Sequence, residues 1–355
     1  MKDITIEELY QLDHPVIIDV RSPIEFKDGS IPGAINIPLF TDDERQEIGT
    51  IYKQVGQDAA KWKAMEFVSP KIPNMLQLIK DTRSDSSDQP IIHCWRGGMR
   101  SKAVVTFLEF AGIRAKRLAG GYKAYRQYIL QEIPRMLPER AIVLHGLTGI
   151  GKTEILKLLN NMGYPVVDLE ELAAHRGSIF GTVGLGNGHN QKTFDSLLFK
   201  RLKEIEGTPY FLMEAESKRI GKATQPEELM TKKFHGIHIY LQTSMEARVQ
   251  HIANEYIYPY EQAPWYYHEI KQNLERIFPR MKDHEMIQQL QTHLENREYT
   301  KMIKILLEDY YDPKYDHKRQ EYVGDFIHIY ADTHEEAAKK VAEQLEDLSI
   351  RPQLV

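Results

Sequence analysis

The single cysteine of this chain, Cys94, begins a segment whose residue types suit anion chemistry. It follows an apolar stretch and precedes a helical pattern, so backbone N–H groups and the helix dipole favour a thiolate there. A lone cysteine is more often a small buried hydrophobe, but two glycines and two arginines in the next six positions are hard to explain by packing. The glycines permit the tight turn that points the N–H groups inward. We therefore predict a nucleophile at the floor of an oxyanion loop formed by Trp95, Arg96, Gly97, Gly98, Met99 and Arg100.

A second segment, G-L-T-G-I-G-K-T at residues 146–153, fits the phosphate-binding P-loop pattern in full. It lies between a predicted strand (residues 141–144) and a predicted helix (Lys152–Asn161). In such a loop the amides cradle phosphate oxygens, the lysine adds a positive charge, and the threonine hydroxyl ordinarily holds Mg²⁺. Thr153 is thus the candidate Mg²⁺ ligand, and no other metal site is predicted. The predicted diphosphate-binding residues are Gly146, Thr148, Gly149, Gly151, Lys152 and Thr153.

Acidic residues near this loop leave its ligand open. A nucleotide triphosphatase usually has an acidic residue at the end of a neighbouring strand. Glu214 and Glu216 follow one predicted strand and Asp168 follows another, but none forms a standard aspartate signature. These carboxylates could also be exposed strand ends. The loop could therefore bind a diphosphate ester without hydrolysing ATP.

Bulk properties restrict the class of protein. The 355 residues are 42% hydrophobic and 27% charged, which is typical of a globular chain of two domains. A net charge of −5 argues mildly against a general nucleic-acid binder, although local basic clusters leave room for a basic groove. No run of about 18 apolar residues occurs, and the first residues lack the apolar block of a signal peptide. We expect a cytoplasmic protein that does not bind membranes, and a single cysteine excludes internal disulfides.

Two α/β patterns follow one another along the chain. The first occupies residues 1–130, with strands predicted at 16–20 and 90–93 and an amphipathic helix ending near Gly112. Residues 131–140 are interpreted as a linker. The second pattern, residues 141–355, has further strands predicted at 164–167, 210–213, 237–241 and Phe326–Tyr330, followed by a helix capped at Thr333. Residues from about 244 to 320 read as a helical segment rich in aromatic residues.

The first domain resembles rhodanese domains. The resemblance rests on D-V-R-S-P-I-E-F at residues 19–26, on G-S-I-P-G-A-I-N-I-P at 29–38 and on G-G-Y at 120–122. It implies a persulfide-carrying role for Cys94. One departure is that five residues separate Cys94 from Arg100, whereas sulfurtransferases of this family typically have four. The longer spacing is that of the related cell-cycle phosphatases and suits a tetrahedral phosphorus group.

The whole chain resembles the tRNA 2-selenouridine synthase family. Both loops agree with that family, including the extra residue of the cysteine loop, and so do residues 168–170, 175–181, 214–221 and 310–312. Residues 182–192 depart from it by being richer in glycine. The implied fold is α/β, with an N-terminal rhodanese-like domain followed by a P-loop NTPase/kinase-like parallel-sheet domain that carries a helical insertion.

The resemblance implies a transferase that acts in two stages on a wobble 5-substituted 2-thiouridine of tRNA. The sulfur is first geranylated with geranyl diphosphate, and selenophosphate then replaces it with selenium. The P-loop would hold the diphosphate, and Cys94 with its loop would handle selenophosphate. No tightly bound cofactor is expected. The partners are the tRNA anticodon region and, as a candidate, an enzyme that supplies selenophosphate. Candidate substrate or RNA contacts are Asp168, His175, Arg176, Glu214, Glu216 and Arg219.

Three other functions remain open on the residues alone. The chain could be a rhodanese sulfurtransferase with a nucleotide-regulated P-loop domain. It could be a small-molecule kinase or NTPase in which the rhodanese module only senses redox state or binds a partner. The spacing of the cysteine loop also leaves a cysteine phosphatase open.

Overall fold

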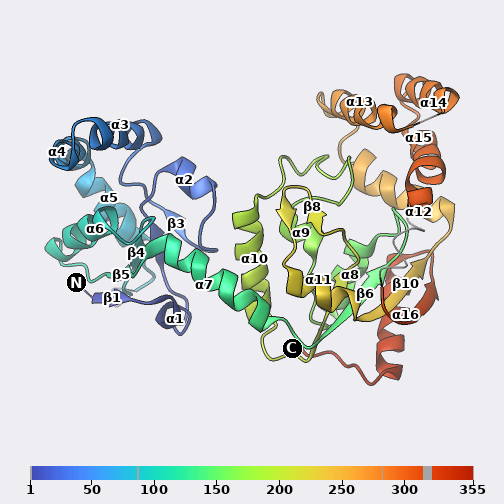
Figure 1. Ribbon diagram of the computed structural model, residues 1–355, viewed down its shortest axis with the longest axis horizontal. Coiled ribbons are helices and arrows are strands. Elements are labelled where there is room, and N and C mark those ends of the chain that lie inside the picture. The colour runs from blue at the N-terminus through green and yellow to red at the C-terminus, as the bar shows by residue number, and fades with distance from the viewer. Residues whose placement is uncertain (1, 86–87, 282, 315–321, 355) are drawn as a thin grey trace. The chain divides into compact units, whose positions relative to one another are not determined.

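The computed structural model describes residues 2–85, 88–281, 283–314 and 322–354. The chain forms two compact units (Figure 1). Unit 1 comprises Met1–Ile133 with the short stretch Asp195–Lys200, and unit 2 comprises Pro134–Phe194 and Arg201–Val355. Each unit is built around its own parallel sheet.

Unit 1 contains a five-stranded parallel sheet in the order β1-β5-β4-β2-β3. The strands are β1 (Lys2–Ile4), β5 (Lys116–Leu118), β4 (Ile91–His93), β2 (Ile17–Asp19) and β3 (Ile35–Asn36). The central strands β2 and β4 are buried at every position, as expected for a parallel sheet covered on both faces. The helices are α1 (Ile6–Leu9), α2 (Pro23–Lys27), α3 (Asp42–Gln54), α4 (Gln57–Val68), α5 (Ile72–Asp81), α6 (Met99–Phe110) and α7 (Gly121–Met136).

The helices α3 and α4 form an antiparallel pair beside this sheet (Figure 1). Thr41 begins α3 with a complete capping box, in which its side chain accepts from the Glu44 N–H and the Glu44 carboxylate accepts from the Thr41 N–H. Gly56, with φ 133°, separates α3 from α4. The start of α3 and the turn between α3 and α4 are therefore both set by residues that are neighbours in the sequence.

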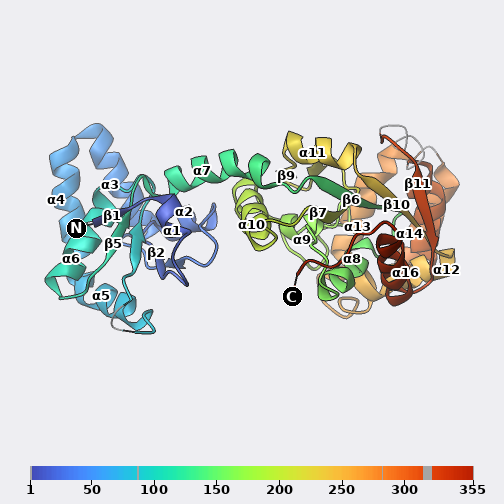
Figure 2. The same cartoon turned by 90° about the horizontal axis from the view of Figure 1, so that it is seen from below.

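Unit 2 contains a four-stranded parallel sheet in the order β11-β10-β6-β7. The strands are β11 (Phe326–Tyr330), β10 (Ile237–Gln242), β6 (Arg140–His145) and β7 (Tyr210–Glu214). Figure 2 shows α8 (Lys152–Asn161) and α16 (His334–Asp347) on one side of the sheet and α11 (Glu227–Phe234) on the other. Apolar residues of α8 and α16, including Leu156 and Val341, share one core with the sheet. The remaining elements beside the sheet are α9 (Leu169–Ala173), α10 (Gln191–Glu204) and the antiparallel hairpin of β8 (Arg219–Ile220) and β9 (Ala223–Thr224).

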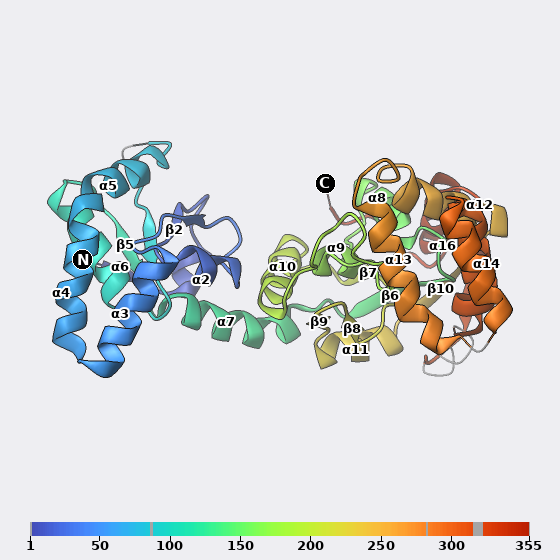
Figure 3. The same ribbon diagram turned by 90° about the horizontal axis from the view of Figure 1, so that it is seen from above.

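A helical subdomain extends unit 2 after β10 (Figure 3). It contains α12 (Met245–Ile252), α13 (Tyr266–Ile277), α14 (His284–Glu295), α15 (Tyr299–Ile305) and two π-helical turns, Ala253–Ile257 and Leu306–Tyr311. It has its own core, which includes the buried rings of Tyr266, Tyr299 and Tyr310. The predicted helical segment is mainly helical, with turns at residues 258–265 and 296–297, and its residues 282 and 315–320 lie outside the described residues.

Most elements predicted from sequence periodicity are confirmed. The helix Lys152–Asn161 and the strand Phe326–Tyr330 have the predicted bounds. The strand predicted at 164–167 is wrong, because only Val166 forms a bridge, to Leu212. The predicted linker, residues 131–140, is helical up to Met136, where α7 ends, and β6 begins at Arg140. No helix in the described part of the chain is both long and apolar enough to cross a lipid bilayer.

Candidate functional site

Cys94 directly follows β4 at the carboxyl end of the sheet of unit 1, and α6 begins five residues later. Its side chain is 3% exposed, and its Sγ lies 3.4 Å from the Ser101 hydroxyl oxygen. Gly98 precedes α6 and has no side chain to cap the helix. The first N–H groups of a helix have no acceptors within it. The structure therefore places the cysteine before the amino end of α6, and the binding of an anion by this loop stays a prediction.

Glycine contacts fix the shape of the cysteine loop. Gly97 and Gly121 have φ values of 63° and 59°, in the left-handed region that favours glycine. A Cβ on Gly121 would lie 2.3 Å from the Cys94 carbonyl oxygen and 2.4 Å from the Gly97 nitrogen. The N–H groups of Tyr122 and Lys123 donate to the carbonyls of Cys94 and Trp95 at 2.9 and 2.8 Å. The start of α7 thus holds the carbonyl groups of Cys94 and Trp95 in place.

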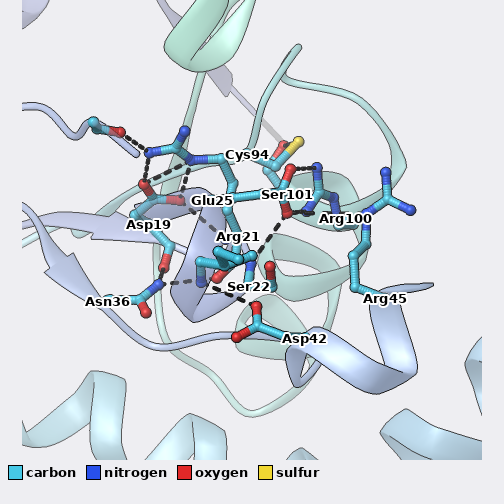
Figure 4. Close-up of polar contacts among 12 residues, drawn as sticks. Asp19, Arg21, Ser22, Glu25, Asn36, Asp42, Arg45, Cys94, Arg100 and Ser101 are labelled. Carbon is cyan, nitrogen blue, oxygen red and sulfur yellow. Dashed lines mark hydrogen bonds and ion pairs between the residues drawn. The ribbon is translucent and has the colours of Figure 1, made fainter. Parts of the chain in front are cut away.

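The two loop arginines have different environments, and Figure 4 shows that of Arg100. Arg100 forms two hydrogen bonds with Glu25, at 2.5 and 3.1 Å. Burial opposes the ionisation of Glu25, but Arg100 outweighs it, so the pKa of Glu25 is lowered. The Nε of Arg45 lies 3.9 Å from the same carboxylate. Arg96 is exposed and forms no ion pair with the residues that the structure describes, so its guanidinium is available to an anion.

A network of buried polar side chains lies next to the cysteine loop. Arg21 is 1% exposed and donates to both oxygens of Asp19, with the shortest contact at 2.6 Å, and to the carbonyl of Gly29 at 2.7 Å. Its guanidinium lies 4.1 Å from the centre of the Tyr122 ring. His93 is fully buried, and burial lowers its pKa to about 4. These contacts join the first strand-to-helix turn to the cysteine loop.

A pocket of about 700 Å³ opens beside Cys94. Its charged lining contains Arg21, Glu25, Asp28, Arg45, Arg96 and Arg100. The rest of its lining consists of Phe40, Ile48, Tyr52, Cys94, Trp95, Gly98 and Met99. The segment 40–52 was not singled out in the sequence, because nothing in its own pattern indicates which loop it faces.

The P-loop lies between β6 and α8, at the carboxyl end of the second sheet. Gly146, Gly149 and Gly151 have φ values of 151°, 86° and 81°. A Cβ on Gly151 would lie 2.0 Å from the His334 Nε2, so a side chain there has no room. The Lys152 ammonium donates to the Gly146 carbonyl at 3.3 Å and therefore folds back over the loop. The loop therefore has the turns and the lysine position that a phosphate cradle needs, and its binding of a diphosphate stays a prediction.

Residues of the helical subdomain brace this loop from outside. The Arg248 Nε donates to the Thr148 carbonyl at 2.8 Å, and its other nitrogens form two hydrogen bonds with Asp312, at 2.8 and 2.6 Å. The His251 Nδ1 lies 3.1 Å from the Gly149 carbonyl. Arg248 is 3% exposed. Sequence reasoning missed Arg248 and His251, because about 100 residues separate them from the loop.

Four carboxylates gather beside Thr153. The Thr153 hydroxyl donates to Glu170 at 2.8 Å, and the Glu170 N–H donates to Glu214 at 2.8 Å. Asp168 caps α9 by accepting from the Glu171 N–H. Glu216 approaches Glu170 across Gly177, because a Cβ on that glycine would lie 2.6 Å from the Glu216 Oε2 and 3.1 Å from the Glu170 Oε1.

Burial raises the pKa of several of these groups. The pKa of Glu170 rises to about 8, first by burial and then by the charge of Glu216, and that of Asp168 rises to about 6 by burial. Glu214 is 0% exposed, and burial together with its acidic neighbours raises its pKa well above the ordinary value. Such a cluster favours a cationic ligand, because a positive charge relieves the mutual repulsion.

The chemistry of the donor set fits Mg²⁺. A threonine hydroxyl and one or two carboxylates, completed by substrate phosphates, are the usual ligands of this ion. Thr153 and Glu170 are adjacent and could serve in this way. Within the described ranges, the protein alone provides no group of three or more His, Cys, Asp or Glu side chains suited to a metal ion. Any Mg²⁺ would therefore depend on the ligand phosphates.

The remaining candidate contacts are spread around this cluster. The His175 Nδ1 accepts from the Gly177 N–H at 3.1 Å, and burial lowers the pKa of His175. Arg176 is largely engaged within the fold, since it donates to the Val183 carbonyl at 2.7 Å, pairs with Glu255 at 2.5 Å and lies over the Tyr256 ring. Arg219 is exposed on the β8–β9 hairpin. Their roles as RNA or substrate contacts stay predictions.

Comparisons with known proteins show the family of the chain. Residues 139–348 match the model of the tRNA 2-selenouridine synthase AAA domain, and residues 5–128 match that of the rhodanese-like domain. A tRNA 2-selenouridine synthase of Pseudomonas syringae pv. syringae is 34% identical over 91% of this chain and 95% of that protein. One of Pseudomonas fluorescens is 38% identical over 70% of this chain and 68% of that protein. The chain therefore belongs to the tRNA 2-selenouridine synthase family.

Proposed function

We propose that this protein replaces sulfur with selenium at position 2 of a wobble 5-substituted 2-thiouridine in tRNA. One observation carries the proposal. The chain has both the cysteine loop and the P-loop, and it matches a tRNA 2-selenouridine synthase over 91% of its own length and 95% of that protein. Each loop lies at the carboxyl end of a parallel sheet, where such folds bind ligands. Two loops for two different phosphorus compounds suit a reaction in two stages.

The first stage is S-geranylation at the P-loop. The sulfur of the base forms a bond to C1 of geranyl diphosphate while the C–O bond breaks and the diphosphate leaves with the electron pair. The base loses the proton of its N3 to water in this step. Stabilising that departing charge is an electrostatic task for Lys152 and the loop amides. Mg²⁺ supplies further positive charge when it is bound, and Thr153 and Glu170 are the residues that would hold it. Alkylation helps the next stage, because a thioether-like sulfur leaves more readily than a thiocarbonyl sulfur.

The second stage is selenation at Cys94. Selenium from selenophosphate bonds to C2 of the base as the C2–S bond breaks, and the geranyl thiolate leaves with the electron pair and takes up a proton. Water then takes the phosphoryl group from selenium. Arg96, Arg100 and the loop amides would bind the oxyanion, while Cys94 handles the selenium donor. Because the chain has no second cysteine, any sulfur–selenium bond at Cys94 must be resolved by the substrate or an outside thiol.

Nucleoside mass spectrometry of tRNA tests this division of labour. With geranyl diphosphate and selenophosphate, the wild-type protein should yield 2-selenouridine. Cys94→Ser should accumulate the geranylated nucleoside and lose the selenonucleoside, whereas Lys152→Ala should lose geranylation but still convert a tRNA that is already geranylated. The opposite pattern would overturn the assignment.

A sulfurtransferase remains the alternative that this experiment must separate. Thiosulfate turnover that depends on Cys94, responds to ATP or GTP and needs no RNA would favour it. Hydrolysis of a chromogenic phosphate ester that is lost in Cys94→Ser would instead indicate a phosphatase.

A further inference from the structure

The pocket beside Cys94 is lined by two chemically different sets of residues. One set contains the loop arginines Arg96 and Arg100, just before and at the start of α6. The other set consists of Phe40, Ile48, Tyr52, Trp95 and Met99, which we call the apolar wall. An oxyanion such as selenophosphate needs only the first set.

The sequence of α3 directs this wall into the pocket. Arg45, Ile48 and Tyr52 are spaced by three and four residues, so they share one face of the helix. Arg45 reaches Glu25 from that face, which places its neighbours beside the same cavity. Phe40, just before the helix, is 5% exposed and anchors the wall in the core of unit 1.

Part of the wall is exposed to solvent. Tyr52 is 58% exposed and Met99 is 60% exposed, although both line the pocket. Apolar surface of this kind gains free energy when a ligand removes it from water. A pocket of about 700 Å³ is within the range that holds ligands much larger than one tetrahedral anion.

We propose that the apolar wall binds the prenyl chain carried by the sulfur of the substrate base. The inference rests on the proposed function and adds a recognition step to it. The Cys94 site would then select prenylated thiouridine over a thiouridine with a small S-alkyl group. It would also hold the prenyl thiolate as the C2–S bond breaks and selenium takes its place at C2.

The test compares two anticodon stem-loop RNAs that carry S-geranyl or S-methyl 2-thiouridine, each with selenophosphate. The wild-type protein should show a KM at least tenfold lower for the S-geranyl RNA. Tyr52→Ser should raise that KM several-fold and change the KM for the S-methyl RNA less than twofold. Tyr52 is exposed, so this variant should fold, and circular dichroism would check that it does.

Val55→Ser is the matched control. Val55 is the C-cap residue of the same helix, is 72% exposed and does not line the pocket. The Val55→Ser protein should therefore keep the wild-type KM for both RNAs. Equal wild-type KM values for the two RNAs, or an equal rise for both in Tyr52→Ser, would overturn the apolar-wall proposal. A wild-type protein that selenates neither RNA would instead contradict the proposed function itself.

Discussion

At the scale of single residues, each site contains a carboxyl group that accepts a hydrogen bond from a side chain of the loop. Glu25 is paired with Arg100, and Glu170 accepts from the Thr153 hydroxyl. The consequences differ. Glu25 has a lowered pKa and remains ionised beside its arginine, whereas the pKa of Glu170 rises to about 8 through burial and the charge of Glu216. The P-loop thus has a carboxyl group that exchanges its proton near neutral pH.

Glu170 should make the stability of unit 2 depend on pH. In the unfolded chain this carboxyl ionises near its ordinary pKa of 4.5, and in the folded protein near 8. Between these values the folded state binds more protons, so the free energy of unfolding falls as pH rises. Glu170→Gln removes this loss. The difference in melting temperature between Glu170→Gln and wild type should therefore increase from pH 5 to pH 8. It should increase by about 2–4 °C for each kcal/mol of destabilisation that the substitution removes.

Glu171→Gln is the control for this measurement, because Glu171 is the exposed neighbour in the same helix. Differential scanning calorimetry across pH 5–8 would follow both variants. A Glu170→Gln melting curve that tracks wild type at every pH would show that the carboxyl ionises normally.

At the scale of elements, both sites depend on glycines where a loop passes close to another segment. In unit 1 the cysteine loop packs against the start of α7, and in unit 2 the P-loop packs against α12 and α16. A parallel sheet places such loops at one edge, but the close approach needs positions without a Cβ. Gly121 is the clearest case, because its Cβ would overlap the backbone of the cysteine loop.

Gly121→Ala should disrupt the cysteine loop. An alanine at φ 59° costs about 1–2 kcal/mol in left-handed backbone strain, and the overlap with Cys94 adds to this cost. We expect a loss of at least about 2 kcal/mol in the denaturant unfolding of unit 1 and a large fall in selenation, with geranylation retained. Urea unfolding and nucleoside mass spectrometry would measure these effects.

Gly112→Ala separates strain from overlap. Gly112 also has a positive φ, of 77°, but a Cβ there would meet nothing within 4 Å. It should lose stability through strain alone and keep its selenation activity. If the two variants behaved alike, the contact between Gly121 and the cysteine loop would not matter.

At the scale of the whole molecule, the two sites are built from separate sets of residues. Every residue that lines the Cys94 pocket belongs to Met1–Ile133, and the P-loop, its bracing residues and its carboxylates belong to unit 2. The residues that we assign to each stage of the proposed reaction therefore come from one unit.

The separation predicts complementation between two inactive proteins. Cys94→Ser keeps the P-loop site and Lys152→Ala keeps the Cys94 site, so neither alone should form 2-selenouridine from 2-thiouridine. Mixed together with both small substrates, they should form it, because the geranylated tRNA made by one is a substrate for the other. The readout is the selenonucleoside as a function of the ratio of the two proteins. No product from a mixture whose half-reactions both work would mean that the intermediate is not released.

Much of the fold was predictable because its signals are local. Apolar runs such as β6, followed by a glycine turn and an amphipathic helix, are contiguous in the sequence, and the structure has α8 and β11 at the predicted bounds. The strand predicted at 164–167 failed for a non-local reason. Its residues Tyr164, Val166 and Val167 are buried, but the segment forms a single bridge, from Val166 to Leu212, and no longer ladder. A buried apolar segment of this kind has the same sequence pattern as a strand.

The sequence by itself determined where the cysteine loop and the P-loop lie, because each consists of neighbouring residues between a strand and a helix that are both recognisable in the sequence. Only the tertiary structure decided what surrounds them. Glu25 meets Arg100, Tyr52 meets the Cys94 pocket, and Arg248 holds the P-loop across long sequence separations. Such contacts depend on how helices pack against a sheet, and no local pattern of residues encodes which distant side chain completes a site.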